Sequence, residues 1–440
     1  MPSMNRSLNI FYIIIFLTYS CVFSFQNFLF NIVNQCKYVD FRYNCSLQVF
    51  SVLNFIGSFF WCYIADRREN HNNVLAFNIS MYIVLIIFVL IASRITNSVY
   101  QIVSITIITI FREFTLGGIL PVFFALVLNY MKRKRIQESK LVMINIFSIL
   151  GNACVMFIMP VISCTGIIKN DRLLSLTVCI VAGTLAIILL LLKTPKFKKD
   201  VKENLTREGR IMHVILKPSV LLYYASVVAI GVYKCIISNF VTTFLQINGL
   251  QMNTIRMLWG TRCIAELFTY IIIPYFAFVP NNILFVISIL VSALSIAFYI
   301  FPELNTTMLV ISEVLKGAGT ASFVYTSILI FKSYATNDIQ TQVQGIRNSA
   351  YNGFSCILFG ILAAVLIDRD LKDPRTVNED ESDEMRNRML NVFESSYFII
   401  FFSLLIAIVP AILARFLKKR NKYPYDVPDY AYPYDVPDYA

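Results

Sequence analysis

Residues 193–218, KTPKFKKDVKENLTREGRIMHVILKP, divide the chain in two. This connector carries eight Lys and Arg residues, and long apolar blocks lie on both sides of it. Each block is long enough to cross a bilayer as an α-helix, which takes roughly 17 to 25 residues. Six blocks precede the connector and six follow it, at 9–33, 46–65, 74–93, 99–130, 141–164, 173–192, 219–241, 252–278, 282–301, 307–334, 340–367 and 394–417.

The overall composition agrees with a membrane protein. Apolar residues make up 57% of the chain and charged residues only 15%, against roughly 25% charged residues in soluble domains. We therefore expect an all-α polytopic membrane protein with twelve transmembrane helices in two pseudo-symmetric bundles. The predicted parts are a six-helix bundle at 1–192, a cytoplasmic connector at 193–218, a second six-helix bundle at 219–417 and a cytoplasmic tail at 418–422.

Basic residues predict the orientation of the chain in the membrane. The side of the spans that holds the N-terminus collects 22 Lys and Arg residues, and the opposite side holds ten. Because cytoplasmic loops carry the excess of Lys and Arg, both termini are predicted to be cytoplasmic, in a plasma-membrane protein. The connector alone could also anchor to anionic lipid. The basic residues lie in short runs without interleaved aromatic residues, so no nucleic-acid partner is expected. The opposite-side segment 368–393 is rich in carboxylates and is predicted to be a solvated loop.

A weak internal repeat supports two related halves. A shift of 200 residues aligns IFREFTLGGILPVFF, at 110–124, with a stretch that contains VISEVLKGAGTASFV. Glu113 then meets Glu313, Gly117 meets Gly317 and Phe123 meets Phe323. Both stretches lie in the fourth span of their half, as a duplicated six-span unit requires. Close helix packing alone would also account for the glycines.

Charged residues within spans are the main candidates for function, because each costs about 2.5–3.5 kcal/mol on insertion scales. Arg262 and Glu266 are four residues apart, and Glu313 and Lys316 are three apart, so each pair shares a helix face. Structural ion pairs are the alternative interpretation. The deep cations outnumber the deep anions by at least one, which favours an anionic solute. The deep charges are Arg112, Glu113, Lys234, Arg262, Glu266, Glu313 and Lys316, with Arg347 nearer the inner end of its span.

Proton coupling requires a carboxylate that takes up and releases a proton within the membrane. Shielding from water favours the protonated form of a carboxyl group, whereas neighbouring cations favour the ionised form. We predict proton coupling by Glu113, Glu266 and Glu313, with Glu113 and Glu266 as the first choices.

Amide and aromatic side chains could hydrogen-bond a solute and stack on its ring, although most aromatic residues here must serve packing or the membrane interface. The residues predicted to bind solute are Gln26, Asn27, Arg112, Lys234, Asn239, Arg262, Lys316, Tyr325, Asn348, Tyr351 and Asn352.

Cysteine and histidine give no catalytic or metal signature. The ten cysteines include no C-x-x-C pair, and both histidines, His71 and His213, fall in predicted loops. No Asp falls deep in a span, so we expect neither a metal, a cofactor nor an enzyme. Cys36 and Cys45 share a predicted outer loop. They could form a disulfide there or remain as two free thiols, and the sequence does not decide between these alternatives.

The end of the second span resembles a known family. IGSFFWCYIADRRENH, at 56–71, is similar to the loop between spans 2 and 3 of the major facilitator superfamily, where an Asp-Arg signature begins a cytoplasmic gate. The resemblance implies that Asp66, Arg67 and Arg68 form this gate. The chain departs from the pattern at Cys62, where the family has glycine, and at Glu69 to His71, where it has Gly-Arg-Arg. Arg112 followed by Gly117 and Gly118 is similar to the family's fourth span, which is associated with proton coupling in some members.

Three further stretches resemble the branch that contains lactose permease and nucleoside:proton symporters: FYIIIFLTYS at 11–20, FLQINGLQMNTIRMLWGTRCIAELF at 244–268, and QVQGIRNSAYNGFSCILFGILAAVLID at 342–368. Glu266 falls where this branch often has a glutamate in span 8. A related branch includes purine nucleoside and nucleotide transporters of intracellular parasites. The resemblance implies two bundles about a central cavity that opens to each side in turn.

The expected function is therefore alternating-access transport of a small polar solute by a monomer, with a purine nucleoside or nucleotide as the first choice and a proton as the co-transported ion. A sugar or oligosaccharide permease is the nearest rival, and a non-transporting receptor or scaffold is a second. The repeated nonapeptide YPYDVPDYA at 423–440 is identified as a tandem haemagglutinin epitope tag.

Overall fold

The computed structural model describes residues 2–33, 47–68, 70–92, 94–95, 97–134, 136, 140–164, 171–194, 213–250, 252–276, 278–300, 305–335, 339–366 and 379–420. These residues form helices and short connections, and no strand occurs among them. The predicted all-α fold class is confirmed. Cys36, Cys45, most of the basic connector and the segment 423–440 lie outside the described residues.

The helices before the connector coincide with the first six predicted spans. They are α1 (Pro2–Val33), the short 3-10 turn η1 (Leu47–Ser51) with α3 (Val52–Arg68), α4 (His71–Ala92), α5 (Ser98–Arg133), α6 (Leu141–Cys164) and α7 (Asp171–Lys193). We call these elements the N-terminal half.

The helices after the connector form the C-terminal half. They are α9 (Pro218–Ile247), α10 (Met252–Ile272) with the 3-10 turn η4 (Ile273–Phe276), α11 (Asn281–Ile300), α12 (Thr306–Lys332), α13 (Gln340–Asn348), the π-helical turn η5 (Ser349–Phe354), α14 (Ser355–Leu366) and α15 (Glu379–Arg420). The predicted eleventh span is thus one helix interrupted by a wider turn.

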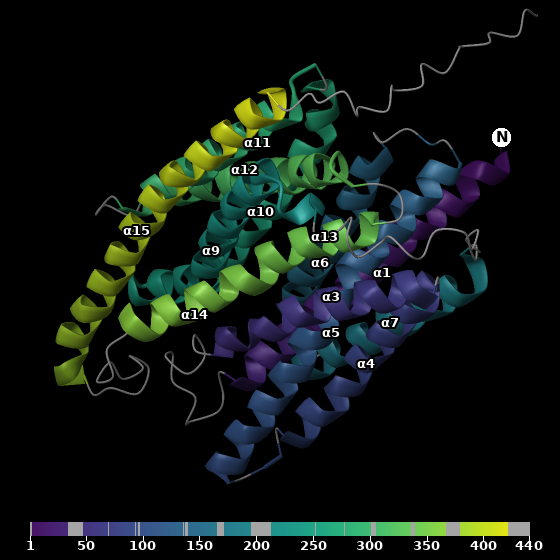
Figure 1. Ribbon diagram of the computed structural model, residues 1–440. Helices are drawn as coiled ribbons and strands as arrows, with labels where there is room; N and C mark the ends of the chain where they lie inside the picture. The colour runs from purple at the N-terminus through teal and green to yellow at the C-terminus, as the bar shows by residue number, and fades with distance from the viewer. Residues whose placement is uncertain are drawn as a thin grey trace, which may run out of the picture.

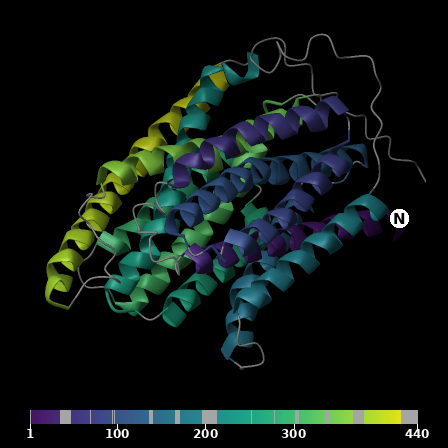
Figure 2. The ribbon, with the colours of Figure 1, turned by 90° about the horizontal axis from the view of Figure 1, so that it is seen from below.

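The two halves lie side by side. Figure 1 shows the purple and blue helices of the N-terminal half on one side and the green and yellow helices of the C-terminal half on the other. Figure 2 shows the same bundle from below. Contacts between the halves run from α6 to α10 and from η1, α3 and α5 to α13, η5 and α14. We call the contact of α3 with α13 and η5 the seam.

Each half has its own apolar core. One buried cluster comes almost wholly from α1, α4, α5 and α7, and a second comes mainly from α9, α11, α12 and α15, with smaller parts from α10, α13, η5 and α14. The bounds of the two predicted bundles remain a prediction.

Nine helices in the described part of the chain are long and apolar enough to cross a membrane. The other three predicted spans coincide with α6, α10 and the interrupted helix α13–η5–α14. The chain is a multi-pass membrane protein, and the count of twelve spans stays a prediction.

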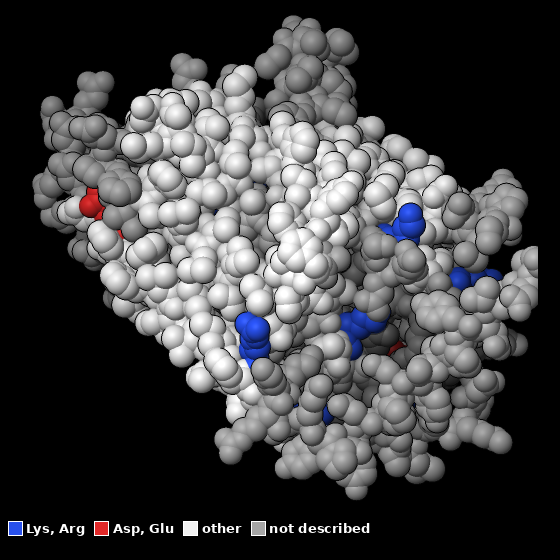
Figure 3. Space-filling model, turned by 90° about the horizontal axis from the view of Figure 1, so that it is seen from above, with Lys and Arg blue, Asp and Glu red and all other residues white. Residues whose placement is uncertain are grey.

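Large apolar side chains remain exposed on the outer helix faces. On α4, for example, Phe77, Ile87 and Phe88 are each more than half exposed. Figure 3 shows one face of the molecule, on which a broad uncharged surface separates the few visible charged side chains. Such an apolar exterior is stable against lipid tails, whereas a protein in water buries it.

Two sequence predictions about loops were wrong. The acidic segment 368–393 was predicted to be a loop, yet α15 begins at Glu379 within it. Glu, Met and Arg favour helix. His71 was also predicted to lie in a loop, but it is the first residue of α4.

Candidate functional site

In the N-terminal half, α5 and α3 bring a charged pair and an amide together. Arg112 Nε lies 3.0 Å from Glu113 Oε1, and Arg112 Nη2 contacts the same oxygen. Asn54 on α3 donates from Nδ2 to Glu113 Oε2 at 3.4 Å. Both oxygens of this buried carboxylate therefore have partners, and its negative charge is compensated by Arg112.

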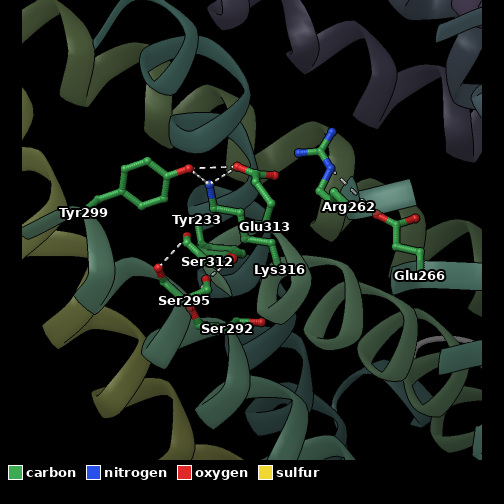
Figure 4. A network of polar contacts seen from close by, with 9 residues as sticks. All are labelled: Tyr233, Arg262, Glu266, Ser292, Ser295, Tyr299, Ser312, Glu313 and Lys316. Atoms are coloured by element: carbon green, nitrogen blue, oxygen red, sulfur yellow. Dashed lines mark hydrogen bonds and ion pairs between the residues drawn. The ribbon is translucent and has the colours of Figure 1, made fainter. Parts of the chain in front are cut away.

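The C-terminal half contains a second, more deeply buried pair. Lys316 Nζ donates to Glu313 Oε1 and to the Tyr299 hydroxyl, both at 2.7 Å, and Tyr299 donates to the same Glu313 oxygen at 2.8 Å (Figure 4). Lys316 and Glu313 are each 1% exposed. The predicted pairing of these residues is confirmed. The geometry gives Lys316 a role in packing α12 against α11, and its predicted contact with solute stays untested.

Arg262 on α10 connects this pair to Glu266. Its Nε lies 3.9 Å from Glu266 Oε1, which confirms the predicted pairing. The guanidinium lies between Glu266 and Glu313 (Figure 4) and interacts electrostatically with both. Glu313 Oε2 is buried without a hydrogen-bond partner among the described residues. Among the described residues, this long contact is the one ion pair of Glu266, so Glu266 is the least constrained of the three deep carboxylates.

A chain of hydrogen bonds starts at Lys234 and crosses the seam. Lys234 is exposed although it lies near the middle of α9, and its Nζ donates to Asn352 Oδ1 at 2.7 Å. Asn352 Nδ2 donates to Asn348 Oδ1 at 2.7 Å, and Asn348 Nδ2 donates to Ser58 Oγ on α3 at 3.2 Å. Ser58 in turn donates to the Gly117 carbonyl on α5 at 2.9 Å. The structure thus connects three of the predicted solute-binding residues in one line.

An aromatic ring lies at the start of this chain. The Lys234 ammonium sits 4.6 Å from the centroid of the Tyr351 ring, within range of a cation–π interaction. The Tyr351 ring also packs against Phe323, with centroids 5.2 Å apart.

Arg347 is a buried cation that the predicted set of solute-binding residues left out. Its Nε donates to Gln344 Oε1 and its Nη1 to Ser327 Oγ, both at 3.1 Å, and the residue is 6% exposed. These partners are neutral. Tyr19, Tyr270 and Tyr351 lie close enough to interact with its charge. The sequence signal that could have identified it was a positive charge within a predicted span.

The charges of the described spans do not balance. Glu113, Glu266 and Glu313 face Arg112, Arg262 and Lys316. Among the described residues, Lys234 and Arg347 form no ion pair with a carboxylate. The expected surplus of positive charge is therefore present, and both surplus cations lie near Tyr351.

At the predicted gate, Asp66 pairs with a histidine. His71 Nε2 lies 3.3 Å from Asp66 Oδ1 and joins the end of α3 to the start of α4. Arg67 is exposed, and its Nη1 donates to the Tyr63 hydroxyl at 3.0 Å. The sequence did not predict the Asp66–His71 contact, because His71 was placed in a loop.

The remaining predicted site residues are less informative. Tyr325 lies partly buried on α12 beside the apolar cluster between α6 and α10. The side chains of Gln26, Asn27, Asn239 and Arg68 lie outside the described part of the chain.

Comparison with known proteins gives a family and a fold. The model described as the MFS_1-like family matches residues 6–377. No curated protein matches the chain in sequence. Among solved structures, the nucleoside transporter NupG is 16% identical with a TM-score of 0.61, covering 91% of this chain and 98% of its own.

Two other solved structures are equally similar in shape. The POT family transporter PepTSo is 12% identical with a TM-score of 0.64, covering 94% of this chain and 98% of its own. The human organic anion transporter MFSD10 (TETRAN) is 10% identical with a TM-score of 0.64, covering 92% of this chain and 100% of its own. Identities this low show a shared fold alone.

Proposed function

The chain belongs to the MFS_1-like family of membrane transporters, and on that premise we propose that it carries purine nucleosides or nucleotides across the membrane by alternating access. The observation that carries the proposal is the position of Lys234 and Arg347. Both are cations without a carboxylate partner among the described residues, and both lie near the Tyr351 ring.

This combination suits a solute with a ring and an anionic or strongly polar group. A tyrosine ring stacks on a nucleobase, and the asparagine amides next to it can hydrogen-bond the base edge. A guanidinium binds phosphate oxygens through charge-assisted hydrogen bonds. The similar fold of NupG, a nucleoside transporter, supports the same class of solute.

Alternating access requires two bodies that move against each other. We assign these bodies to 1–192 and 219–417, with the seam and the α6–α10 contact closing and opening between them. Both termini are taken to be cytoplasmic, and the carrier is taken to act as a monomer in the plasma membrane.

We assign the proton-coupling role to Glu266. Glu113 has partners at both oxygens, and Glu313 is paired with Lys316. In the described part of the chain, Glu266 makes a single ion pair, the 3.9 Å contact with Arg262, and it lies within electrostatic range of Lys234. A proton bound there would change the charge next to the solute.

Uptake of radiolabelled adenosine and ATP into cells that express the protein tests the proposal, with unlabelled adenosine, ATP, lactose, a dipeptide and an aromatic carboxylate as competitors. Saturable uptake that only the purines inhibit supports it. Uptake or inhibition confined to lactose would instead indicate a sugar permease. Absence of flux for every compound, with the protein at the cell surface, would indicate a receptor or scaffold.

A further inference from the structure

The Lys234 side chain needs a support that fixes its position. A lysine ammonium stands on a flexible four-carbon stem, which samples many rotamers when it is unrestrained. Here the ammonium contacts the Asn352 amide oxygen at 2.7 Å and lies 4.6 Å from the centroid of the Tyr351 ring. Both neighbours belong to the π-helical turn η5.

The chain of hydrogen bonds behind Lys234 has only one direction. An ammonium can only donate, and a backbone carbonyl can only accept. Lys234 therefore fixes Asn352 with its oxygen toward the ammonium and its NH₂ toward Asn348. The same argument orients Asn348 toward Ser58, whose hydroxyl donates to the Gly117 carbonyl. The orientation of each amide depends on the next member of the chain.

The turn η5 is clamped between two helices. Gly353 lies so close to α3 that a Cβ there would be 2.8 Å from the Phe55 nitrogen. On the other side, a Cβ at Gly231 on α9 would be 2.6 Å from the Tyr351 carbonyl oxygen. Wide turns of this kind within an α-helix frequently occur at functional sites. The turn that carries Asn352 is thus held between α3 and α9.

We propose that Asn352 and Asn348 are positioning residues for Lys234, and that they make its solute-binding position depend on closure of the seam. The inference rests on the proposed function, because it assumes that Lys234 contacts the solute. When α3 separates from η5, the bond from Asn348 to Ser58 breaks and the amides lose their fixed orientation. Lys234 then loses its support, and affinity for solute falls in that state.

We call the hydrogen-bond chain from Lys234 through Asn352 and Asn348 to Ser58 the relay. A double-mutant cycle in which KM is measured tests it. The variants are Lys234→Met, Asn352→Leu and the double variant, with adenosine and ATP uptake measured at equal surface expression. A lost hydrogen bond to a charged group corresponds to about a tenfold or larger change in affinity. We expect each single variant to raise KM about tenfold with little change in maximal rate, and the double variant to match Lys234→Met.

The matched control is Asn78→Leu. Asn78 is a fully buried amide in α4 whose one hydrogen bond to a described residue goes to the carbonyl of Val74 in its own helix, so KM should not change. An Asn352→Leu effect that adds in full to that of Lys234→Met, or an unchanged KM in Asn352→Leu, would overturn the inference and leave the purine proposal intact.

A second readout does not depend on the solute. Cys62 is fully buried on α3, and its Sγ would lie 3.0 Å from a Cβ at Gly345 across the seam. Maleimide labelling of Cys62, followed by mass spectrometry, reports how often the seam opens. The relay predicts that Cys62 is labelled faster in Asn348→Leu, Asn352→Leu and Lys234→Met. The double variant of Lys234→Met and Asn352→Leu should be labelled no faster than its single variants. If the wild type takes up no purine, the proposed function fails. Separately, an unchanged rate of Cys62 labelling in all variants would overturn the relay.

Discussion

Gly117 and Gly317, which are 200 residues apart, make the same contact in the two halves of the molecule. A Cβ at Gly317 would lie 2.5 Å from the Arg262 carbonyl oxygen and 3.0 Å from the Glu266 nitrogen on α10. A Cβ at Gly117 would lie 2.8 Å from the Ser58 nitrogen on α3 and closer still to the Asn54 carbonyl oxygen. In each half, the fourth span therefore touches the backbone of the second.

Because of this close contact, we predict that adding a single methyl group at either glycine destabilises the fold. Gly117→Ala and Gly317→Ala should each destabilise the protein by about 1–3 kcal/mol, because backbone atoms cannot move aside as side chains do. Thermal denaturation of the purified protein measures the loss. Ser104→Ala, on the exposed face of α5, is the control and should change little.

Replacing only Lys316 of the Lys316–Glu313 pair should destabilise the protein more than replacing both residues. Lys316→Met leaves Glu313 buried beside Tyr299 without its closest cation, a change that costs about 3–5 kcal/mol in comparable cases. The double variant Glu313→Leu with Lys316→Met should recover most of that loss. The measurement is the melting temperature of the single and the double variant. An equal decrease in both variants would contradict the pairing.

Replacement of Arg347 should discriminate between charged and uncharged solutes. Arg347→Gln removes the buried guanidinium but keeps an amide of similar reach, so KM for ATP should rise about tenfold and KM for adenosine much less. Arg94→Gln, at an exposed turn position two residues after the end of α4, is the matched control. An equal effect on both solutes would mean that Arg347 does not contact the phosphates.

Replacement of Glu266 should remove the pH dependence of uptake. In a proton symporter, uptake falls as the external pH rises, because the inward proton gradient weakens. Glu266→Gln cannot exchange a proton, so its uptake should vary little between pH 5.5 and 8, values chosen as about one to two units either side of neutrality. Glu113→Gln should keep the wild-type dependence. The opposite result would move the coupling role to Glu113.

Asn305 offers a test of orientation. It begins the sequon Asn305-Thr306-Thr307, caps α12 and is exposed. If the N-terminus is cytoplasmic, Asn305 and Asn44 face outward, and Asn204 in the connector does not. A mobility shift that glycosidase removes, and that Asn305→Gln or Asn44→Gln reduces, supports this orientation. Modification of Asn204 would reverse it.

Hydrophobicity and charge spacing predicted much of the architecture. Helices occur at all twelve predicted spans, and the pairs Glu313–Lys316 and Arg262–Glu266 follow from their spacing of three and four residues. Adjacent residues do not share a helix face, so the Arg112–Glu113 pair was not expected.

Other features depend on packing between distant segments. The π-helical turn η5 is held against α3 and α9 by contacts at Gly353 and Gly231, which span more than a hundred residues of sequence. Lys234 and Lys316 also look alike in sequence as single lysines within apolar spans. Only the structure shows that Lys316 is enclosed with its carboxylate, whereas Lys234 is exposed and bonded to an amide.

The unequal pairing of the cations has an electrical consequence. Lys316 and Glu313 lie in the same half and would move together, so their motion transfers no net charge across the membrane potential. Lys234 and Arg347 pair with no carboxylate in the part of the chain that the structure describes. The membrane potential does work of about 2.3 kcal/mol per 100 mV on each charge that crosses the full field. Negative charge on a bound solute would offset this work in the loaded carrier, whereas the empty carrier would experience it in full.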